Sequence, residues 1–341
     1  MRFLFGVALF CYLIVIIVGF SFENECSNRI TYKHIHINAH LDKEALLLPP
    51  DSIEISLILE EWKSLNYDND EVVIINEFNH SLSRKTIIIE HQYEGRKHYG
   101  ALILPKGGFK PSAPLLVLTP GLNQRQPTVN LNRNQWFQKM ITGLEDMAIL
   151  IPSFRGQALR SGDNIYCSDG FFGDAYDGAA IDALRLMAAA EKLYPTITDN
   201  TYVYGISRGA TVATLMAARN SNISMVIAQS GPYDFMGDHA YKKYGLQFKY
   251  QFLSRKMDKE AIRKKIISSS PRYFTPAIES DVMLIHGRND EVCSFEKAVD
   301  FLESFPTSKK VNHKWVEGGH GLYEFSYAIE KIKEHRIKTM E

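Results

Sequence analysis

The sequence Gly205-Ile206-Ser207-Arg208-Gly209 contains a serine in a pattern, G-x-S-x-G, that is typical of a catalytic nucleophile. A β-rich stretch precedes it and an Ala-rich, helix-forming run follows. In this strand–turn–helix context a tight turn lifts the serine hydroxyl above the carboxyl ends of a parallel sheet. The flanking glycines are required because a Cβ there would clash with the neighbouring strand or helix. We therefore predict that Ser207 is a nucleophile, rather than an ordinary serine near a helix start.

A serine hydroxyl is a weak nucleophile, so it needs a base within hydrogen-bond reach and an acid that orients the base. In this kind of fold the chain order is serine, carboxylate, histidine. Asp290 comes shortly after the apolar stretch 282–285, and His320 lies in a glycine-rich loop after residues 314–316. Each follows an expected strand. Together with Ser207 they predict a catalytic triad, although Asp290 alone also fits a turn and His320 alone a surface loop.

Other groups near these positions fit the two roles less well. His313 precedes the last expected strand, and His286 lies on a strand end, where we expect it to pack inside. Glu291 is adjacent to Asp290 and would point elsewhere.

Acyl transfer passes through a tetrahedral intermediate whose oxyanion needs N–H donors. The first donor should be the backbone N–H of Arg208, which follows the nucleophile. We assign the second to the N–H of Leu122, in the loop after the strand expected at 115–118. The alternative for Pro120-Gly121 is a simple turn.

Strands and helices alternate from about residue 84 onward. Apolar and β-branched stretches predict strands at 86–90, 99–104, 115–118, 147–152, 202–204, 225–228, 282–285 and 314–316. Helical periodicity predicts helices at 174–193, 208–219, 294–304 and 323–333. This order predicts an α/β class with a mostly parallel sheet and helices on both faces. Sites in such sheets form at the carboxyl ends of the strands.

Residues 232–280 interrupt the alternation with a polar stretch that is rich in aromatic residues. An insertion at this place would hang over the mouth of the site, so we interpret it as a small cap; an ordinary surface excursion is the alternative. We divide the rest of the chain into an N-terminal extension at 22–83 and a catalytic domain at 84–341.

The N-terminus has the pattern of a targeting segment. Met1-Arg2 is followed by an uncharged run from Phe3 to Phe20, and Glu23 comes soon after. We predict a cleaved signal peptide over residues 1–21, with an uncleaved membrane anchor as the alternative. Either segment would place the rest of the chain outside the cytosol.

Composition excludes some partners and leaves others open. The 341 residues include 39 basic and 39 acidic side chains, so no net field attracts nucleic acid or an anionic membrane. Contact with a membrane is expected only through an N-terminal anchor. We expect no metal and no cofactor, and the alternation of His34, His36 and His40 fits an exposed strand better than a ligand set.

Three cysteines lie outside the N-terminal apolar run, namely Cys26, Cys167 and Cys293. In an oxidising compartment this number allows one disulfide and one free thiol, and the pairing stays open.

Several segments in the same order resemble the catalytic domain of the prolyl oligopeptidase family of serine peptidases over roughly residues 84–335. They are Phe154-Arg155-Gly156 with Gly162 beyond, Asp174 and Asp177, Gly205 to Gly209, Ser270 to Tyr273, Leu284 to Gly287 with Asp290 to Val292, and Gly319-His320-Gly321. The resemblance implies an α/β-hydrolase fold, with Ser207 as nucleophile, Asp290 as acid and His320 as general base.

The chain also departs from this family. Ala210 stands where the family elbow usually has a second glycine, and Thr119-Pro120-Gly121-Leu122 lacks the family's tyrosine and paired glycines. Those peptidases also carry a β-propeller, whose blades take about 40–50 residues each. Residues 22–83 cannot hold several blades, so the propeller that filters short peptides should be absent.

These observations predict a serine hydrolase that acts on a small peptide or ester substrate through an acyl-enzyme intermediate. Resemblance to the family favours peptide bonds, the absence of a propeller favours carboxylic esters, and the sequence as a whole leans slightly to a peptidase. A non-catalytic hydrolase-like binding protein is the alternative outside the enzymes. The sequence predicts no oligomeric state.

Overall fold

The computed structural model describes residue 26 and residues 42–79, 84–111, 113–123, 127–254, 257–322 and 324–340. The N-terminal segment expected at 1–21 and the three histidines His34, His36 and His40 lie outside these residues. Within the described part of the chain, no helix is long and apolar enough to cross a lipid bilayer.

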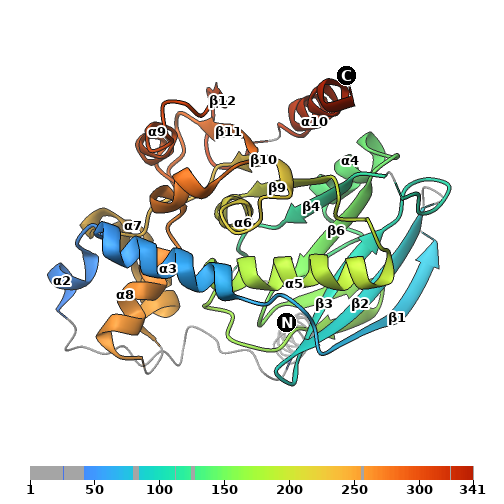
Figure 1. Cartoon of the computed structure of the whole chain (residues 1–341), viewed down its shortest axis with the longest axis horizontal. Helices are drawn as coiled ribbons and strands as arrows, with labels where there is room; N and C mark the ends of the chain where they lie inside the picture. The colour runs from blue at the N-terminus through green and yellow to red at the C-terminus, as the bar shows by residue number, and fades with distance from the viewer. Residues whose placement is uncertain are drawn as a thin grey trace, which may run out of the picture.

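A large mixed sheet forms the centre of the fold (Figure 1). In spatial order its strands are β1 (Glu71–Asn79), β2 (Lys85–Tyr93), β3 (Arg96–Ile103), β6 (Ala148–Ser153), β4 (Leu115–Thr119), β9 (Thr201–Ile206), β10 (Ile223–Gln229), β11 (Asp281–Gly287) and β12 (Val311–Val316). The pairs from β1 to β6 are antiparallel, and those from β6 to β12 are parallel. The predicted α/β class with a mostly parallel sheet is confirmed.

Helices cover both faces of this sheet. They are α4 (Gln135–Gly143), α5 (Asp177–Leu193), α6 (Arg208–Ala217), α9 (Phe295–Glu303) and α10 (Phe325–Met340). Side chains of α5, α6 and α9 belong to one core, and those of α4 and α10 to a second core. In β4, Leu115 and Val117 enter the first core, whereas Leu116 and Leu118 enter the second. Because successive side chains of a strand alternate, an unbroken apolar run supplies both cores.

The boundary predicted at residue 84 is wrong, because it cuts the sheet. β1 pairs with β2 over its whole length, from Glu71 opposite Gln92 to Asn79 opposite Lys85. β1 is an edge strand with mostly exposed side chains. Its sequence therefore carries little of the apolar pattern that indicates a buried strand.

A small second sheet lies in the stretch between β4 and α5. It consists of β5 (Thr128–Asn130), β7 (Ala158–Ser161) and β8 (Asn164–Cys167). None of these strands was predicted from the sequence, because three or four residues are too few to show the alternating pattern of a strand. β8 packs beside the large sheet, where the Ser168 hydroxyl accepts from the Tyr99 N–H at 3.1 Å and donates to the Ser153 carbonyl at 2.8 Å.

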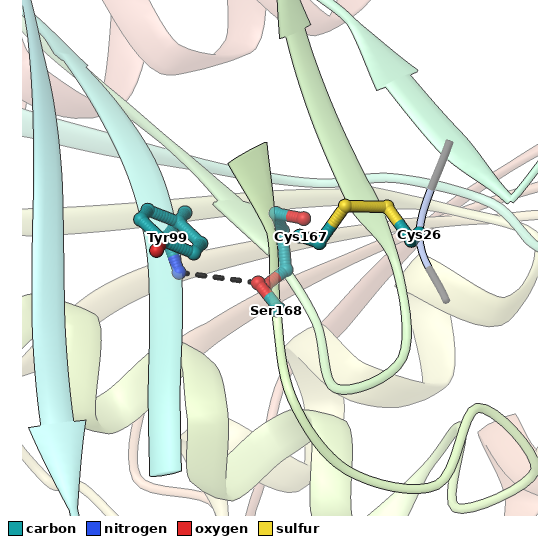
Figure 2. The surroundings of a disulfide bond; sticks show 5 residues. Cys26, Tyr99, Cys167 and Ser168 are labelled. Atoms are coloured by element: carbon teal, nitrogen blue, oxygen red, sulfur yellow. Dashed lines mark hydrogen bonds between the residues drawn. A yellow bond between two sulfur atoms is a disulfide. The ribbon is translucent and has the colours of Figure 1, made fainter. Parts of the chain in front are cut away.

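A disulfide joins Cys26 to Cys167 at the end of β8, with the two Cα atoms 5.7 Å apart (Figure 2). The two cysteines are 141 residues apart in the sequence. Figure 2 shows that Ser168, the next residue, bonds to Tyr99 on β3. Residue 26 is thereby fixed to the small sheet beside the large one. Cys293 is the remaining described cysteine, and it is buried and free.

Residues between β10 and β11 form the expected insertion. Its helical segments are α7 (Asp238–Phe248), the π-helix η2 (Lys249–Leu253), α8 (Lys259–Ser268) and the 3-10 helix η3 (Pro271–Ala277). Two N-terminal helices, α2 (Lys43–Leu47) and α3 (Ser52–Ser64), lie beside α8 (Figure 1).

Arg263 of α8 joins the insertion to these N-terminal helices. Its guanidinium makes two bonds to the Glu54 carboxylate, at 2.5 and 2.7 Å, and donates to the carbonyls of Ala45, Leu46 and Leu48. The Trp62 ring of α3 packs on Phe274 of the insertion, with ring centroids 4.3 Å apart. The N-terminal residues from 42 onward are therefore part of the same packed body as the insertion.

A buried ion-pair cluster connects the insertion to the sheet domain. Lys265 of α8 contacts Asp177 at 2.6 Å and Asp174 at 3.1 Å, and Asp174 also receives a bond of 2.7 Å from Arg155. Arg219 pairs with Asp177 from the other side. Both carboxylates are buried. α8 is thus held against the start of α5 by charges that have little access to water.

We expect Lys265→Met to lower the free energy of unfolding by about 3 kcal/mol, because it leaves two buried carboxylates short of one cation. Lys264→Met is the matched control. The neighbouring Lys264 pairs with Glu61 at the surface, where both side chains are about half exposed, so its loss should cost less than about 1 kcal/mol. Urea unfolding at pH 7 measures both, and equal effects would contradict the role of the cluster.

The effect of Lys265→Met should depend on pH. Burial opposes the charge on Asp177, but Lys265 and Arg219 outweigh burial and lower the pKa of its carboxyl. The stability that the ionised Asp177 contributes is therefore present above the unfolded pKa of about 3.9. It is lost as the pH falls through the lower pKa of the folded state. Burial also opposes the charge on Lys265, but Asp174 and Asp177 raise its pKa. This contribution is present below about pH 10.4 and is lost as the pH rises through the folded value.

Candidate active site

Ser207 is the single residue between the end of β9 and the start of α6. Its backbone has φ 56° and ψ −123°, a conformation that residues other than glycine rarely adopt and that costs free energy. The Ser207 N–H donates to the Gln229 carbonyl of β10 at 2.8 Å. The strand–turn–helix context predicted from the sequence is thus present, and the strain is typical of a nucleophile elbow.

The two glycines of the elbow allow backbones to approach too closely for a side chain. A Cβ on Gly205 would lie 2.0 Å from the Gly209 carbonyl oxygen, and a Cβ on Gly209 would lie 1.7 Å from the Thr119 carbonyl oxygen. Both distances are far inside van der Waals contact. The reason given for these glycines from the sequence is therefore confirmed.

The structure brings Ser207, Asp290 and His320 together. His320 Nε2 lies 2.9 Å from Ser207 Oγ, and His320 Nδ1 lies 2.9 and 3.1 Å from the two Asp290 oxygens. An ionised carboxylate only accepts hydrogen bonds, so Nδ1 carries the proton. Nε2 then presents its lone pair to the Ser207 hydroxyl. This is the geometry that a base needs to remove the serine proton.

The environment of Asp290 keeps its carboxylate ionised. Burial alone would raise the pKa of this carboxyl, but the hydrogen bonds from His320 and from the Cys293 N–H outweigh burial and lower it. Oδ1 accepts from the N–H groups of Val292 at 2.9 Å and Cys293 at 2.8 Å. The loop therefore fixes the carboxylate in the position from which it orients the imidazole.

A second histidine, His286, also lies beside Asp290. It is buried, as expected, and its Nε2–H donates to the Cys293 carbonyl at 2.8 Å, with Asp290 Oδ2 at 3.4 Å. Burial lowers the pKa of His286, so the ring is neutral and supports the loop. Of the two imidazoles, His320 is the one in contact with Ser207.

Arg208 and Leu122, the residues predicted to supply oxyanion donors, both line the pocket that contains Ser207 and His320. Arg208 is the first residue of α6, where N–H groups have no partner within the helix. The loop after β4 packs against the elbow. A Cβ on Gly121 would lie 3.5 Å from Ser207 Cβ, and the Thr119 hydroxyl donates to the Gly209 carbonyl at 2.8 Å.

The pocket above Ser207 has a volume of about 360 Å³. Besides Ser207, His320, Arg208 and Leu122, its walls include Asn123, Tyr176, Pro232, Tyr244, Gln247, Val292 and Cys293. Tyr244 and Gln247 come from α7, so part of the insertion contributes to the site. Neither Tyr176 nor Cys293 was predicted from the sequence to line the site. Only the position of Cys293, three residues after Asp290 in the same loop, could have indicated it.

No group of histidine, cysteine, aspartate or glutamate side chains suited to holding a metal ion occurs among the residues that the structure describes.

Together, the parallel sheet, the elbow and the hydrogen-bonded serine, histidine and aspartate define a serine hydrolase of the α/β-hydrolase fold. The sequence profile of the prolyl oligopeptidase family matches residues 140–336. Because this match covers more than half of the chain, the protein belongs to the prolyl oligopeptidase family. No curated protein sequence matches the chain significantly.

Solved structures with the same fold include esterases and a peptidase. An acetyl xylan esterase from Paenibacillus sp. R4 superposes with a TM-score of 0.57 at 13% identity, over 86% of this chain and 99% of that one. An esterase from Pyrococcus furiosus gives 0.56 at 18% identity, over 80% and 98%. The Pyrococcus horikoshii acylaminoacyl peptidase gives 0.51 at 12% identity, over 77% of this chain and 49% of that one.

Proposed function

We propose that this serine hydrolase cleaves carboxylic esters through an acyl-enzyme formed on Ser207. The observation that carries the proposal is the contact of His320 with both the serine hydroxyl and the Asp290 carboxylate. The type of bond is inferred from the pocket. Among the described residues that line it there is no carboxylate, and therefore no counter-charge for the amino terminus of a peptide.

The geometry supports a two-step acyl transfer. Ser207 Oγ attacks the ester carbonyl carbon while its proton passes to His320 Nε2, and the carbonyl oxygen becomes an oxyanion. The intermediate collapses, the C–O bond to the alcohol breaks, and His320 returns the proton to the leaving alkoxide. His320 then takes a proton from a water molecule, which attacks the acyl carbonyl carbon. The bond to Ser207 Oγ breaks, His320 returns the proton to Oγ, and the carboxylic acid leaves. Asp290 stays ionised throughout and stabilises the imidazolium.

Peptide hydrolysis is the second candidate. Membership of the prolyl oligopeptidase family and the shared fold of the acylaminoacyl peptidase support it. The esterases favour the ester proposal, because two of them match nearly their whole length to this chain. The peptidase is matched over only about half of its length. For this reason we propose an esterase, although the sequence alone slightly favoured a peptidase.

We further propose that the protein works outside the cytosol. The Cys26–Cys167 bond supports this, because structural disulfides persist mainly in oxidising compartments. The apolar run predicted as a signal peptide or anchor supports it independently.

Substrates that share one acyl group and differ only in the bond separate the two candidates. We expect acetyl and N-acetylalanyl methyl esters to turn over with kcat/KM at least about 100-fold above the corresponding amides and anilides. An alkoxide is the better leaving group, and no carboxylate among the described lining residues binds the amine of a peptide. The turnover that remains in a parallel preparation of Ser207→Ala measures the contribution of contaminating enzymes, which is then subtracted. Anilides of unblocked amino acids turning over within about tenfold of the esters would favour the peptidase instead.

A further inference from the structure

We propose that the guanidinium of Arg208 is a positioning group for the oxyanion hole. It holds the loop after β4 so that the N–H of Leu122 faces the carbonyl that Ser207 attacks. The inference rests on the proposed acyl transfer at Ser207, and it applies to esters and amides alike. It gives one residue two tasks, since the Arg208 backbone N–H is itself the other predicted donor.

The side chain of Arg208 turns back from the elbow to the neighbouring loop. Its Nη2 donates to the carbonyls of Pro120 and Gly121, both at 3.0 Å, and its Nε lies 3.2 Å from the Pro120 carbonyl. Two consecutive carbonyls of the loop are thus bound by one planar group. A guanidinium suits this task because its donors lie in a fixed plane.

Fixing these carbonyls also fixes the N–H groups that follow them. The carbonyl of Gly121 and the N–H of Leu122 belong to one peptide unit, which is planar, and in a trans unit they point in opposite directions. With the Gly121 carbonyl directed at Arg208, the Leu122 N–H is directed away from the guanidinium. Leu122 itself lines the pocket above Ser207. The bond to the carbonyl therefore sets the direction of the predicted donor.

The guanidinium is held on its other sides as well. Arg208 is 1% exposed, its Nη2 lies 3.2 Å from Gln157 Oε1, and its Cζ lies 4.7 Å from the centre of the Phe154 ring. A charged group packed in this way has few alternative positions. Preorganised donors matter in catalysis because they need no reorientation when the oxyanion forms.

The sequence of the loop, Thr119-Pro120-Gly121-Leu122, is compatible with this arrangement. Pro120 has no N–H to contribute, but its carbonyl is free to accept. The loop is tied to the elbow by the Arg208 guanidinium and by the Thr119–Gly209 hydrogen bond.

Arg208→Met keeps an unbranched stem of similar shape and removes the guanidinium with all of its donors. We expect kcat on an ester substrate to fall about 10²- to 10³-fold, the usual effect of losing one oxyanion donor. KM should stay within about threefold, because the ground-state carbonyl makes little use of this donor. Affinity for a boronic acid, whose tetrahedral adduct with Ser207 places an anionic oxygen at the same position, should fall by a factor similar to that for kcat. Arg208→Lys retains one charged donor but loses the planar fork, so its kcat should lie above that of Arg208→Met and at least about tenfold below that of the wild type.

Arg219→Met is the matched control. Arg219 follows the same helix, its side chain is fully buried, and it binds Asp177 and packs on the Trp62 ring, in the ion-pair cluster. Its loss should lower thermal stability and leave kcat and boronic acid affinity close to those of the wild type. A merely structural role for Arg208 would produce this same pattern.

The measurements distinguish the possible failures. If Arg208→Met is folded by circular dichroism and its kcat stays within about threefold of the wild type, the positioning role is wrong. If Arg208→Met does not fold, Arg208→Lys decides the question by the same criterion. If the wild-type protein is not labelled by a fluorophosphonate, the proposed acyl transfer itself has failed. Labelling of the wild type with no change in Arg208→Lys and Arg208→Met overturns only the positioning role.

Discussion

Replacing Ser207 by alanine should lower kcat by about 10⁴- to 10⁶-fold, because the variant lacks the atom that attacks the substrate carbonyl. The fold should not change. The strained backbone of Ser207 is fixed by its neighbours, since its N–H binds the Gln229 carbonyl and the flanking glycines remain. Turnover of an ester, together with mass spectrometry after fluorophosphonate treatment, measures the effect. The label should be found on residue 207 of the wild type and be absent from the variant.

Ser230 supplies a matched control for this experiment. It also directly follows a parallel strand, β10, and its φ is 54°. Its hydroxyl is buried and has no hydrogen-bond partner within the described part of the chain. Ser230→Ala should therefore retain both the label and kcat. Labelling that disappears from Ser230→Ala and persists in Ser207→Ala would show that the wrong serine has been assigned.

The order of the three side chains along the chain was sufficient to predict that they meet. Each follows a strand of a parallel sheet, and the carboxyl ends of such strands share one edge. Asp290 comes after β11 and His320 after β12, next to each other in the sheet. The pairing required no knowledge of the loops, because neighbouring strands already place both residues within reach of the elbow.

Features that depend on contacts between distant segments could not be predicted from the order of residues along the chain. β1 joins the sheet only through backbone pairing with β2, and its exposed side chains give no apolar period. The contacts of Arg263 with Glu54 span 209 residues. The disulfide partner of Cys26 was undetermined for the same reason, since three cysteines allow several pairings and only packing selects one.

The Arg208 side chain shows a different limit. The residue was predicted for its backbone N–H, which follows from its position after the nucleophile. The direction of its side chain depends on where the loop after β4 passes, and the sequence does not fix that path. The hydrogen bonds of the guanidinium to the carbonyls of Pro120 and Gly121, both 3.0 Å long, follow from that path alone.

Replacing His320 by glutamine should reduce kcat about as much as removing the serine, by about 10⁴- to 10⁶-fold, because a neutral amide cannot take the proton from Ser207. Glutamine can still donate a hydrogen bond to Asp290, so the loop should keep its structure. His313→Gln is the control. This exposed histidine lies on the preceding strand β12 and was considered as an alternative base. Its replacement should leave kcat unchanged.

The double variant Ser207→Ala/His320→Gln provides the sharper test, because residues that act as a unit are not additive. If His320 serves only to activate Ser207, its removal from a protein that already lacks the serine has no further effect. Esterase activity of the double variant should then equal that of Ser207→Ala within about threefold. A further loss of 100-fold or more (about 2.7 kcal/mol) would mean that His320 acts independently of the serine, for example by activating water directly. In that case the contact of 2.9 Å between Nε2 and Oγ would not be the basis of catalysis.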